Sequence, residues 1–185
     1  MSAAAKTQSS PAPTATPWAE VRGSVIHGRG MYAVQRIPKG TRIIEYVGER
    51  ITQGEANRRD AARLARKDRG DDGCVYLFEV NKRALIDGDV EWNTARLINH
   101  SCAPNCEPQN IRGRIWIVAL KNIPAGAELA YDYGFEFDNW RDHPCRCGHA
   151  GCVGYIVGKA HRRRVRRILG REQPAAQARQ TPGSA

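Results

Sequence analysis

The stretch RLINHSCAPNC, residues 96–106, gathers polar groups of a kind that can bind ligands. It holds Asn99, His100, Cys102 and Cys106 around a proline. Amide, imidazole and thiol groups can orient a bound molecule by hydrogen bonding, and the imidazole and thiol can also bind a metal. The stretch therefore predicts a binding site, a metal site, or both.

A second segment, CRCGHAGC, carries three further thiols at Cys145, Cys147 and Cys152. Gly148 and Gly151 allow this short loop to curl, so that three sulfurs can face one point. Zinc in structural sites takes four ligands in a tetrahedron. Three local thiols therefore predict a zinc site whose fourth ligand comes from elsewhere, and the alternative is three unligated thiols in a loop.

The sequence offers several groups as the fourth ligand, and spacing alone does not choose among them. The chain has six cysteines and no apolar signal segment, which favours thiols or metal over disulfides. The candidates are Cys102, Cys106, Cys74, His143 and His149.

The two ends of the chain differ in composition from the body. Residues 1–17 hold only Ala, Ser, Thr, Pro, Gln, one Met and one Lys, which offer no core to bury and predict a disordered leader, and residues 173–185 predict a disordered tail. The leader lacks the apolar core of a signal peptide, and no apolar run is long enough to span a membrane. The expected folded body runs from about residue 18 to residue 169.

The body reads as a series of short strands. Residues 24–52 alternate short apolar runs with turn residues, CVYLFEV and ALIDG read as two arms of a hairpin, and 114–135 predicts two more strands. RIPKGTRI and NIPAGAEL share an Ile-Pro-x-Gly pattern that is typical of a tight turn opening a strand. Residues 53–68 change to a helical period and predict a surface helix.

Positive charge gathers at the end of the body. The net charge is +10, and residues 159–172 carry seven Lys and Arg against one Glu. This basic helix or tail is either a solvated face or a contact for nucleic acid or another anionic surface.

RLINHSCAPNC, AELAYDYG and CRCGHAGC, in that order and preceded by HGRGMYA, resemble the SET-domain protein lysine methyltransferases with a post-SET zinc loop. The resemblance implies a SET domain at 20–135, a post-SET loop at 136–158, and a mostly β (β-clip) fold. This fold consists of several small sheets of short strands with a pseudoknot between the NHSC and DYG segments, plus one or two short helices. S-adenosyl-L-methionine and zinc are the implied cofactors.

The resemblance also implies roles for individual residues. The zinc ligands would be Cys102, Cys145, Cys147 and Cys152, whereas Cys106 would be structural. The implied cofactor-binding residues are Arg29, Gly30, Met31, Tyr76, Arg96, Asn99, His100 and Tyr133, with backbone contacts from the first three.

Four aromatic residues are the implied catalytic set: Tyr133, Tyr131, Tyr76 and Phe78. Tyr133 matches the family's catalytic tyrosine, which orients the methyl group and the amine. The substrate lysine must be neutral to accept a methyl group, although its reference pKa is about 10.4. A dry aromatic channel beside a sulfonium disfavours the ammonium form. A hydroxyl at Tyr131 can hold a water beside the amine, which predicts mono-methylation.

The expected function is therefore methyl transfer from S-adenosyl-L-methionine to a lysine of a histone tail or another basic protein segment. The alternative is an idle, zinc-stapled binding module that docks on nucleic acid or protein through 159–172. No membrane contact is expected. The expected location is the cytoplasm, with the nucleus or chromatin as the alternative.

Overall fold

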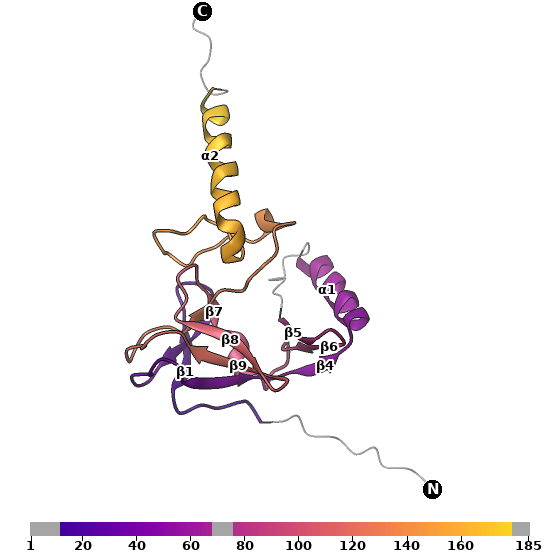
Figure 1. Ribbon diagram of the computed structural model, residues 1–185, viewed down its shortest axis with the longest axis vertical. Coiled ribbons are helices and arrows are strands. Elements are labelled where there is room, and N and C mark those ends of the chain that lie inside the picture. Colours follow the sequence, from indigo (N-terminus) through magenta and orange to yellow (C-terminus); the bar gives the residue numbers. More distant parts are fainter. Residues whose placement is uncertain (1–11, 68–75, 179–185) are drawn as a thin grey trace, which may run out of the picture.

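The structure is a computed structural model that describes residues 12–67 and 76–178. It consists mostly of short strands in several small sheets, with two α-helices beside them (Figure 1). The mostly β architecture predicted from the sequence is confirmed.

Two three-stranded antiparallel sheets form most of the body. The first has the order β3-β9-β8, with β3 at Arg42–Tyr46, β9 at Arg114–Ala119 and β8 at Cys106–Ile111. The second has the order β4-β6-β5, with β4 at Glu49–Ile51, β6 at Ala84–Asp87 and β5 at Leu77–Asn81. The β5–β6 pair is the predicted hairpin.

Two smaller pairings complete the strands. The first is antiparallel, between β1 (Ala19–Gly23) and β2 (Arg29–Ala33). The second is parallel, between β7 (Asn99–His100) and β10 (Ala130–Tyr131). Because β7 and β10 pair directly, the NHSC and DYG segments meet as the expected pseudoknot requires.

The two look-alike turns contact each other. Ile37 and Ile123 form an isolated antiparallel bridge, in which each backbone N–H donates to the other's carbonyl at 2.9 Å. Gly40 and Gly126, which end the two patterns, have φ values of 82° and 81°. Glycine adopts such positive φ angles at little cost, so the shared sequence pattern reflects turn chemistry, as predicted.

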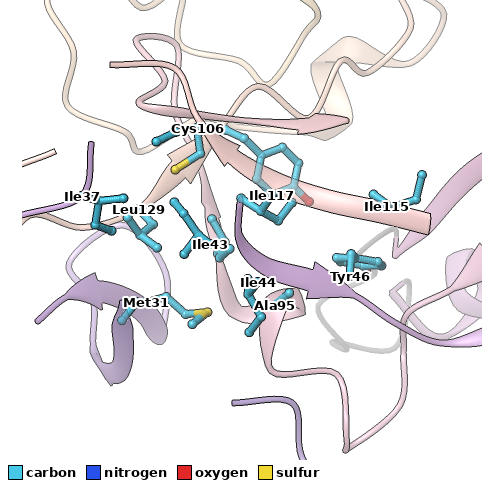
Figure 2. Packing of buried hydrophobic residues seen from close by; sticks show 14 of the residues in the cluster. Met31, Ile37, Ile43, Ile44, Tyr46, Ala95, Cys106, Ile115, Ile117 and Leu129 are labelled. Atoms are coloured by element: carbon cyan, nitrogen blue, oxygen red, sulfur yellow. The ribbon is translucent and has the colours of Figure 1, made fainter. Parts of the chain in front are cut away.

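The larger of two hydrophobic clusters in the described chain packs side chains from these sheets together (Figure 2). Ile37, Ile117 and Leu129 are each 0% exposed, and Met31 is 1% exposed. Strand β3 buries both Ile43 and Ile44. The core also contacts Tyr131 and Tyr133, so the aromatic residues of the site rest on a packed base.

Helix α1 (Gln53–Lys67) lies beside the β4-β6-β5 sheet and buries Ala56. Helix α2 (Arg162–Ala178) stands away from the sheets at the end of the described chain (Figure 1). Short 3-10 turns are found at Thr94–Leu97, Trp140–Asp142 and Lys159–His161. Neither α-helix in the described chain is both long and apolar enough to cross a membrane.

The structure describes only short parts of the two ends for which composition predicts disorder. Residues 12–17 lie along the body, because Thr14 bonds to the backbone of residues 92 and 94, and the Thr16 hydroxyl donates to the Ile43 carbonyl at 2.5 Å. A segment whose only apolar side chains are those of Ala and Pro is held here by the polar groups of its two threonines. At the other end, α2 continues past residue 172 to Ala178. Residues 1–11 and 179–185 lie outside the described parts.

Candidate functional site

Four thiols meet at the junction of the NHSC segment and the C-terminal loop. The sulfur atoms of Cys102, Cys145, Cys147 and Cys152 all lie within 4.8 Å of one another. The Cys102 sulfur is 4.0 Å from that of Cys145 and 3.6 Å from that of Cys152. Tetrahedral zinc with sulfur bonds of about 2.3 Å places its ligands about 3.8 Å apart, so the four positions fit a zinc ion.

The other candidates for the fourth ligand are used elsewhere. Cys106 is 0% exposed in the hydrophobic core, and burial raises its pKa to about 12. The His143 ring packs edge-on against Phe135, with ring centroids 4.7 Å apart. The His149 Nδ1 accepts a hydrogen bond from Gly151 at 3.0 Å. Cys74 lies outside the described residues.

The pKa values of the thiols show that the cluster resists ionisation at most of its cysteines. Burial raises the pKa of Cys102 to about 12 and raises that of Cys145 strongly. Burial also disfavours the Cys147 thiolate, but backbone hydrogen bonds outweigh this effect and lower its pKa to about 7. Four thiolates at this spacing would repel one another, and a bound cation removes that repulsion. The donor set therefore suits zinc.

His100 connects the cysteine cluster to the DYG segment. Its Nδ1 accepts a hydrogen bond from the Tyr133 N–H at 3.2 Å, so the proton of the neutral ring lies on Nε2. Nε2 is 3.5 Å from the Cys102 sulfur. Burial lowers the pKa of His100 to about 4, which keeps the ring neutral at pH 7. The ring therefore bridges Tyr133 and Cys102 of the thiol cluster.

Asn99 organises the opposite side of β7. Its Nδ2 lies 3.0 Å from the Arg29 carbonyl, 2.7 Å from Glu128 Oε1 and 3.1 Å from Ser24 Oγ. Gly30 is buried here, and a Cβ atom at this position would lie only 2.2 Å from Glu128 Oε1. Gly30, the second glycine of HGRG, is therefore needed for the close approach of the chain to Glu128.

The neighbours of Gly30 are placed differently from each other. The Arg29 side chain is exposed, whereas the Met31 side chain is in the core. The Met31 carbonyl accepts a hydrogen bond from the Leu129 N–H at 2.7 Å. The backbone contacts to the cofactor that the resemblance implies for Arg29 and Met31 stay predictions. A buried Met31 side chain does not conflict with them, because they involve the main chain.

Aromatic rings line the path from β5 to the DYG segment. The ring centroid of Phe78 is 6.0 Å from that of Tyr131, which is 4.9 Å from that of Tyr133. Sequence reasoning missed two members of this row: Tyr46, 4.6 Å behind Phe78, and Phe135, 5.7 Å beyond Tyr133. Phe135 directly follows the DYG motif, which could have indicated its position.

The two tyrosines of YDYG differ in environment. Tyr131 is 7% exposed, and burial raises its pKa well above the usual range, so it is a phenol. The Tyr133 hydroxyl is only partly buried and donates to the Ile98 carbonyl at 3.0 Å. Ile98, which directly precedes β7, thus fixes the orientation of the predicted catalytic tyrosine.

Tyr76 and Arg96 lie together at the other end of the row. The Arg96 guanidinium lies 5.9 Å from the centre of the Tyr76 ring, and its Nη1 is 3.5 Å from Asp89. The Tyr76 carbonyl accepts a hydrogen bond from the Tyr46 hydroxyl at 3.1 Å. The structure therefore brings these two predicted cofactor-binding residues into contact.

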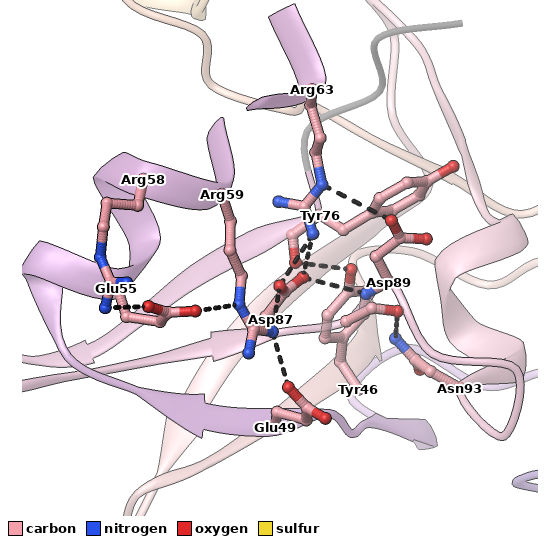
Figure 3. A network of polar contacts seen from close by, with 11 residues as sticks. Tyr46, Glu49, Glu55, Arg58, Arg59, Arg63, Tyr76, Asp87, Asp89 and Asn93 are labelled. Atoms are coloured by element: carbon pink, nitrogen blue, oxygen red, sulfur yellow. Dashed lines mark hydrogen bonds and ion pairs between the residues drawn. The ribbon is translucent and has the colours of Figure 1, made fainter. Parts of the chain in front are cut away.

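A buried ion-pair network beneath Tyr76 was not predicted (Figure 3). Asp87, 1% exposed, accepts hydrogen bonds from Arg59 at 2.8 Å and from Arg63 at 2.7 Å. Burial opposes ionisation of Asp87, but the two arginines outweigh it and hold its pKa below the ordinary value. Both arginines are on α1, so the network fixes this helix to β6, the strand that pairs with the strand of Phe78.

Comparison with known proteins agrees with this geometry. Residues 28–134 match the SET domain. The chain is 41% identical over 139 residues to a Chaetomium globosum protein named histone-lysine N-methyltransferase, H3 lysine-4 specific, and 42% identical over 139 residues to the Saccharomyces cerevisiae protein of that name. It is also 40% identical over 134 residues to human histone-lysine N-methyltransferase 2D.

These matches cover 72% of this chain for the two fungal proteins and 70% for the human one. The chain spans only 12% of the length of each of these fungal relatives and 2% of the human one. The SET match includes Gly28–Gly30 of HGRG and all of NHSC and DYG, which the structure brings together around β7 and β10. The chain belongs to the SET-domain family.

Proposed function

We propose that this domain transfers a methyl group from S-adenosyl-L-methionine to the amine of a protein lysine. The observation that carries the proposal is the parallel pairing of β7 with β10. It sets Asn99 and Gly30, on the predicted cofactor side, directly beside Tyr131 and Tyr133, on the predicted lysine side. The predicted cofactor site and the predicted lysine site therefore lie on either side of this strand pair.

The sulfonium of the bound S-adenosyl-L-methionine supplies the electrophilic methyl group. Methyl transfer to an amine is an in-line displacement, so the protein contributes mainly by positioning the reactants. Asn99, His100 and the HGRG backbone hold the donor side. Tyr133, whose phenol hydrogen bonds to Ile98, is fixed where it can orient the amine.

The aromatic row favours the neutral lysine that the reaction needs. Burial that raises the pKa of Tyr131 disfavours charge at that point, and the same desolvation lowers the pKa of an amine beside it. Phe78 and Tyr131 provide walls without a carboxylate that would stabilise an ammonium. The lysine therefore loses its proton to solvent as it enters this channel.

Mono-methylation is the proposed product outcome. The Tyr131 ring stands in a row of aromatic side chains, with its centroid 6.0 Å from that of Phe78 and 4.9 Å from that of Tyr133. A hydroxyl there leaves less room for an amine that already carries methyl groups, and it can hold a water in their place.

The four cysteines would hold a structural zinc ion. With all four positions taken by thiolates, the metal has no open site for a substrate, so it acts as a staple. Through Cys102 it would fix the C-terminal loop to the NHSC segment, and through His100 it would support Tyr133.

The proposed substrate is the histone H3 tail at lysine 4. The names of the fungal relatives carry this specificity, and the similarity to them extends over 139 residues, 72% of this chain. A histone substrate favours the chromatin-associated alternative over the cytoplasmic location that the sequence suggested.

Transfer of labelled methyl groups to core histones tests the proposal. Label on a histone lysine is expected. If the donor binds and no histone or other basic protein is labelled, the domain is instead the idle binding module.

A further inference from the structure

The basic segment beyond the zinc loop forms a helix with two distinct faces. Val165 is 0% exposed and packs with Trp140, Val153 and Val157, and Ile168 and Leu169 pack on the same cluster. The apolar face of α2 is therefore already covered by the post-SET loop. The remaining face, which we call the arginine face, consists of Arg163, Arg164, Arg166, Arg167 and Arg171, all exposed.

Helix α2 is fixed to the body, so the arginine face has a set position. The Arg162 guanidinium donates to the Cys102 carbonyl at 2.7 Å and to Asp132 at 2.7 Å. Arg164 stacks 3.7 Å over the Phe137 ring centre, and Arg166 donates to the Gly151 carbonyl at 3.2 Å. The charges are thus held beside the zinc loop.

Three members of this face have no acidic partner. No ion pair joins Arg163, Arg167 or Arg171 to a carboxylate within residues 12–67 and 76–178. The Glu172 carboxylate is instead paired with Arg141 at 2.5 Å. These three guanidinium groups can therefore neutralise an external anion.

The placement of these arginines opposes helix stability. The first turn of α2 contains no acidic residue, although the positive end of the helix dipole favours one there. Arg163 and Arg167, and Arg167 and Arg171, are also like-charged pairs four residues apart, which destabilise a helix. A solvated face selected for stability alone would mix charges here, so the pattern indicates an anionic partner.

We propose that the arginine face of α2 binds the phosphate backbone of duplex DNA. From Arg163 to Arg171 the helix rises about 12 Å, and a duplex carries one negative charge per about 1.7 Å of its axis. The face presents no aromatic ring between its arginines, whereas single strands are bound largely by base stacking on aromatic side chains. Charge without stacking groups favours the duplex.

Fluorescence anisotropy of the full chain with a labelled short duplex tests this proposal. With three to five phosphates neutralised, the affinity is expected to fall roughly 40- to 500-fold between about 50 and about 200 mM salt. The triple variant R163Q/R167Q/R171Q should bind more weakly, and its slope of log affinity against log salt should be flatter by about 2.7.

A matched variant separates the arginine face from net charge. R36Q/K39Q/R83Q removes the same charge from exposed side chains of the SET body. It should keep the wild-type slope. Equal losses in both triple variants, no duplex binding at the lowest salt, or tighter binding of a single strand or of polyglutamate would each overturn the proposal.

The inference is independent of the catalytic proposal. R163Q/R167Q/R171Q should methylate a free H3 peptide at the wild-type rate, because none of the three residues contacts the β7–β10 site. Its melting temperature should not fall, since the substitutions remove like-charge repulsion.

Discussion

Arg162, the first residue of α2, is bound to Asp132, the residue between the two tyrosines of YDYG. Arg162 Nη2 donates to Asp132 Oδ2 at 2.7 Å, and its Nη1 and Nε donate to the carbonyls of Cys102 and Val157 at 2.7 Å and 3.1 Å. One side chain therefore joins the DYG segment, a cysteine of the four-thiol cluster and the C-terminal loop.

Arg162→Gln should weaken this junction. Glutamine cannot reach all three acceptors and leaves the partly buried Asp132 without its charge partner, so we expect a loss of about 2–3 kcal/mol in the free energy of unfolding. For a domain of this size that lowers the melting temperature by roughly 5–10 °C. Arg163→Gln, one residue further on the exposed face, is the control and should leave the melting temperature unchanged. Equal melting temperatures for both variants would contradict this role of Arg162.

Cys145→Ser should release zinc. Three remaining thiolates bind the metal far more weakly than four, and the post-SET loop depends on it for order. Elemental analysis of the purified protein should give about one zinc ion per chain for the wild type and almost none for the variant. Cys106→Ala is the control, because Cys106 is buried away from the cluster: it should lose packing but keep its zinc. Zinc retained by Cys145→Ser would show that the cluster is not the metal site.

Tyr131→Phe should change the number of methyl groups added. Removing the hydroxyl leaves room for a larger amine and an apolar wall, so the di- and tri-methyl products should increase in the mass spectrum of a methylated peptide. Tyr46→Phe is the control: it removes a buried hydroxyl from the ring that packs on the far side of Phe78 from Tyr131. It should leave the product distribution unchanged, although it loses the hydrogen bond to the Tyr76 carbonyl. An unchanged distribution in Tyr131→Phe would refute the product proposal.

Asp87 should make the fold sensitive to acid. Its pKa in the folded chain lies below the ordinary value of 3.8, so its stabilisation is complete above that value and is lost as the pH falls through the folded pKa. Asp87→Asn should cost about 3–5 kcal/mol at pH 7, because the buried Arg63 loses its main charge partner and keeps only the longer ion pair with Asp89 at 3.5 Å. The variant should then lose less further stability than the wild type between about pH 5 and about pH 3.

Denaturant unfolding at a series of pH values measures this effect. Glu45→Gln is the control, since Glu45 is paired with Arg114 at the surface, and it should change the free energy of unfolding by less than about 1 kcal/mol at any pH. A wild-type pH profile retained by Asp87→Asn would contradict the assignment.

The parts of the site that follow from local spacing could be predicted from the sequence. Three features depend on residues close together in the chain: the thiols of CRCGHAGC, the alternation of short apolar runs with turn residues, and the hairpin of β5 and β6. The fourth ligand of the three local thiols could be chosen only from the order of the motifs. Cys102 is one of five candidates by spacing, and the resemblance favours it.

Contacts between distant residues could not be predicted in the same way. Arg162 is the first of three adjacent arginines, and nothing local distinguishes the one that binds Asp132. Asp87 lies 24 residues from Arg63 in the sequence and looks like a turn residue before glycine. Thr14 and Thr16 sit in a segment whose composition predicts disorder, because composition does not record hydrogen bonds to a surface formed elsewhere.

The most direct test of the central claim is mass spectrometry of an H3 tail peptide incubated with S-adenosyl-L-methionine and the wild-type chain, Tyr133→Phe or Tyr155→Phe. We expect one methyl group on lysine 4 with the wild type, the same product with Tyr155→Phe, whose ring packs on Trp140 in the loop, and almost none with Tyr133→Phe. Donor binding should persist in all three. Full methylation by Tyr133→Phe, or no methylated lysine with a wild-type chain that binds the donor, would contradict the account.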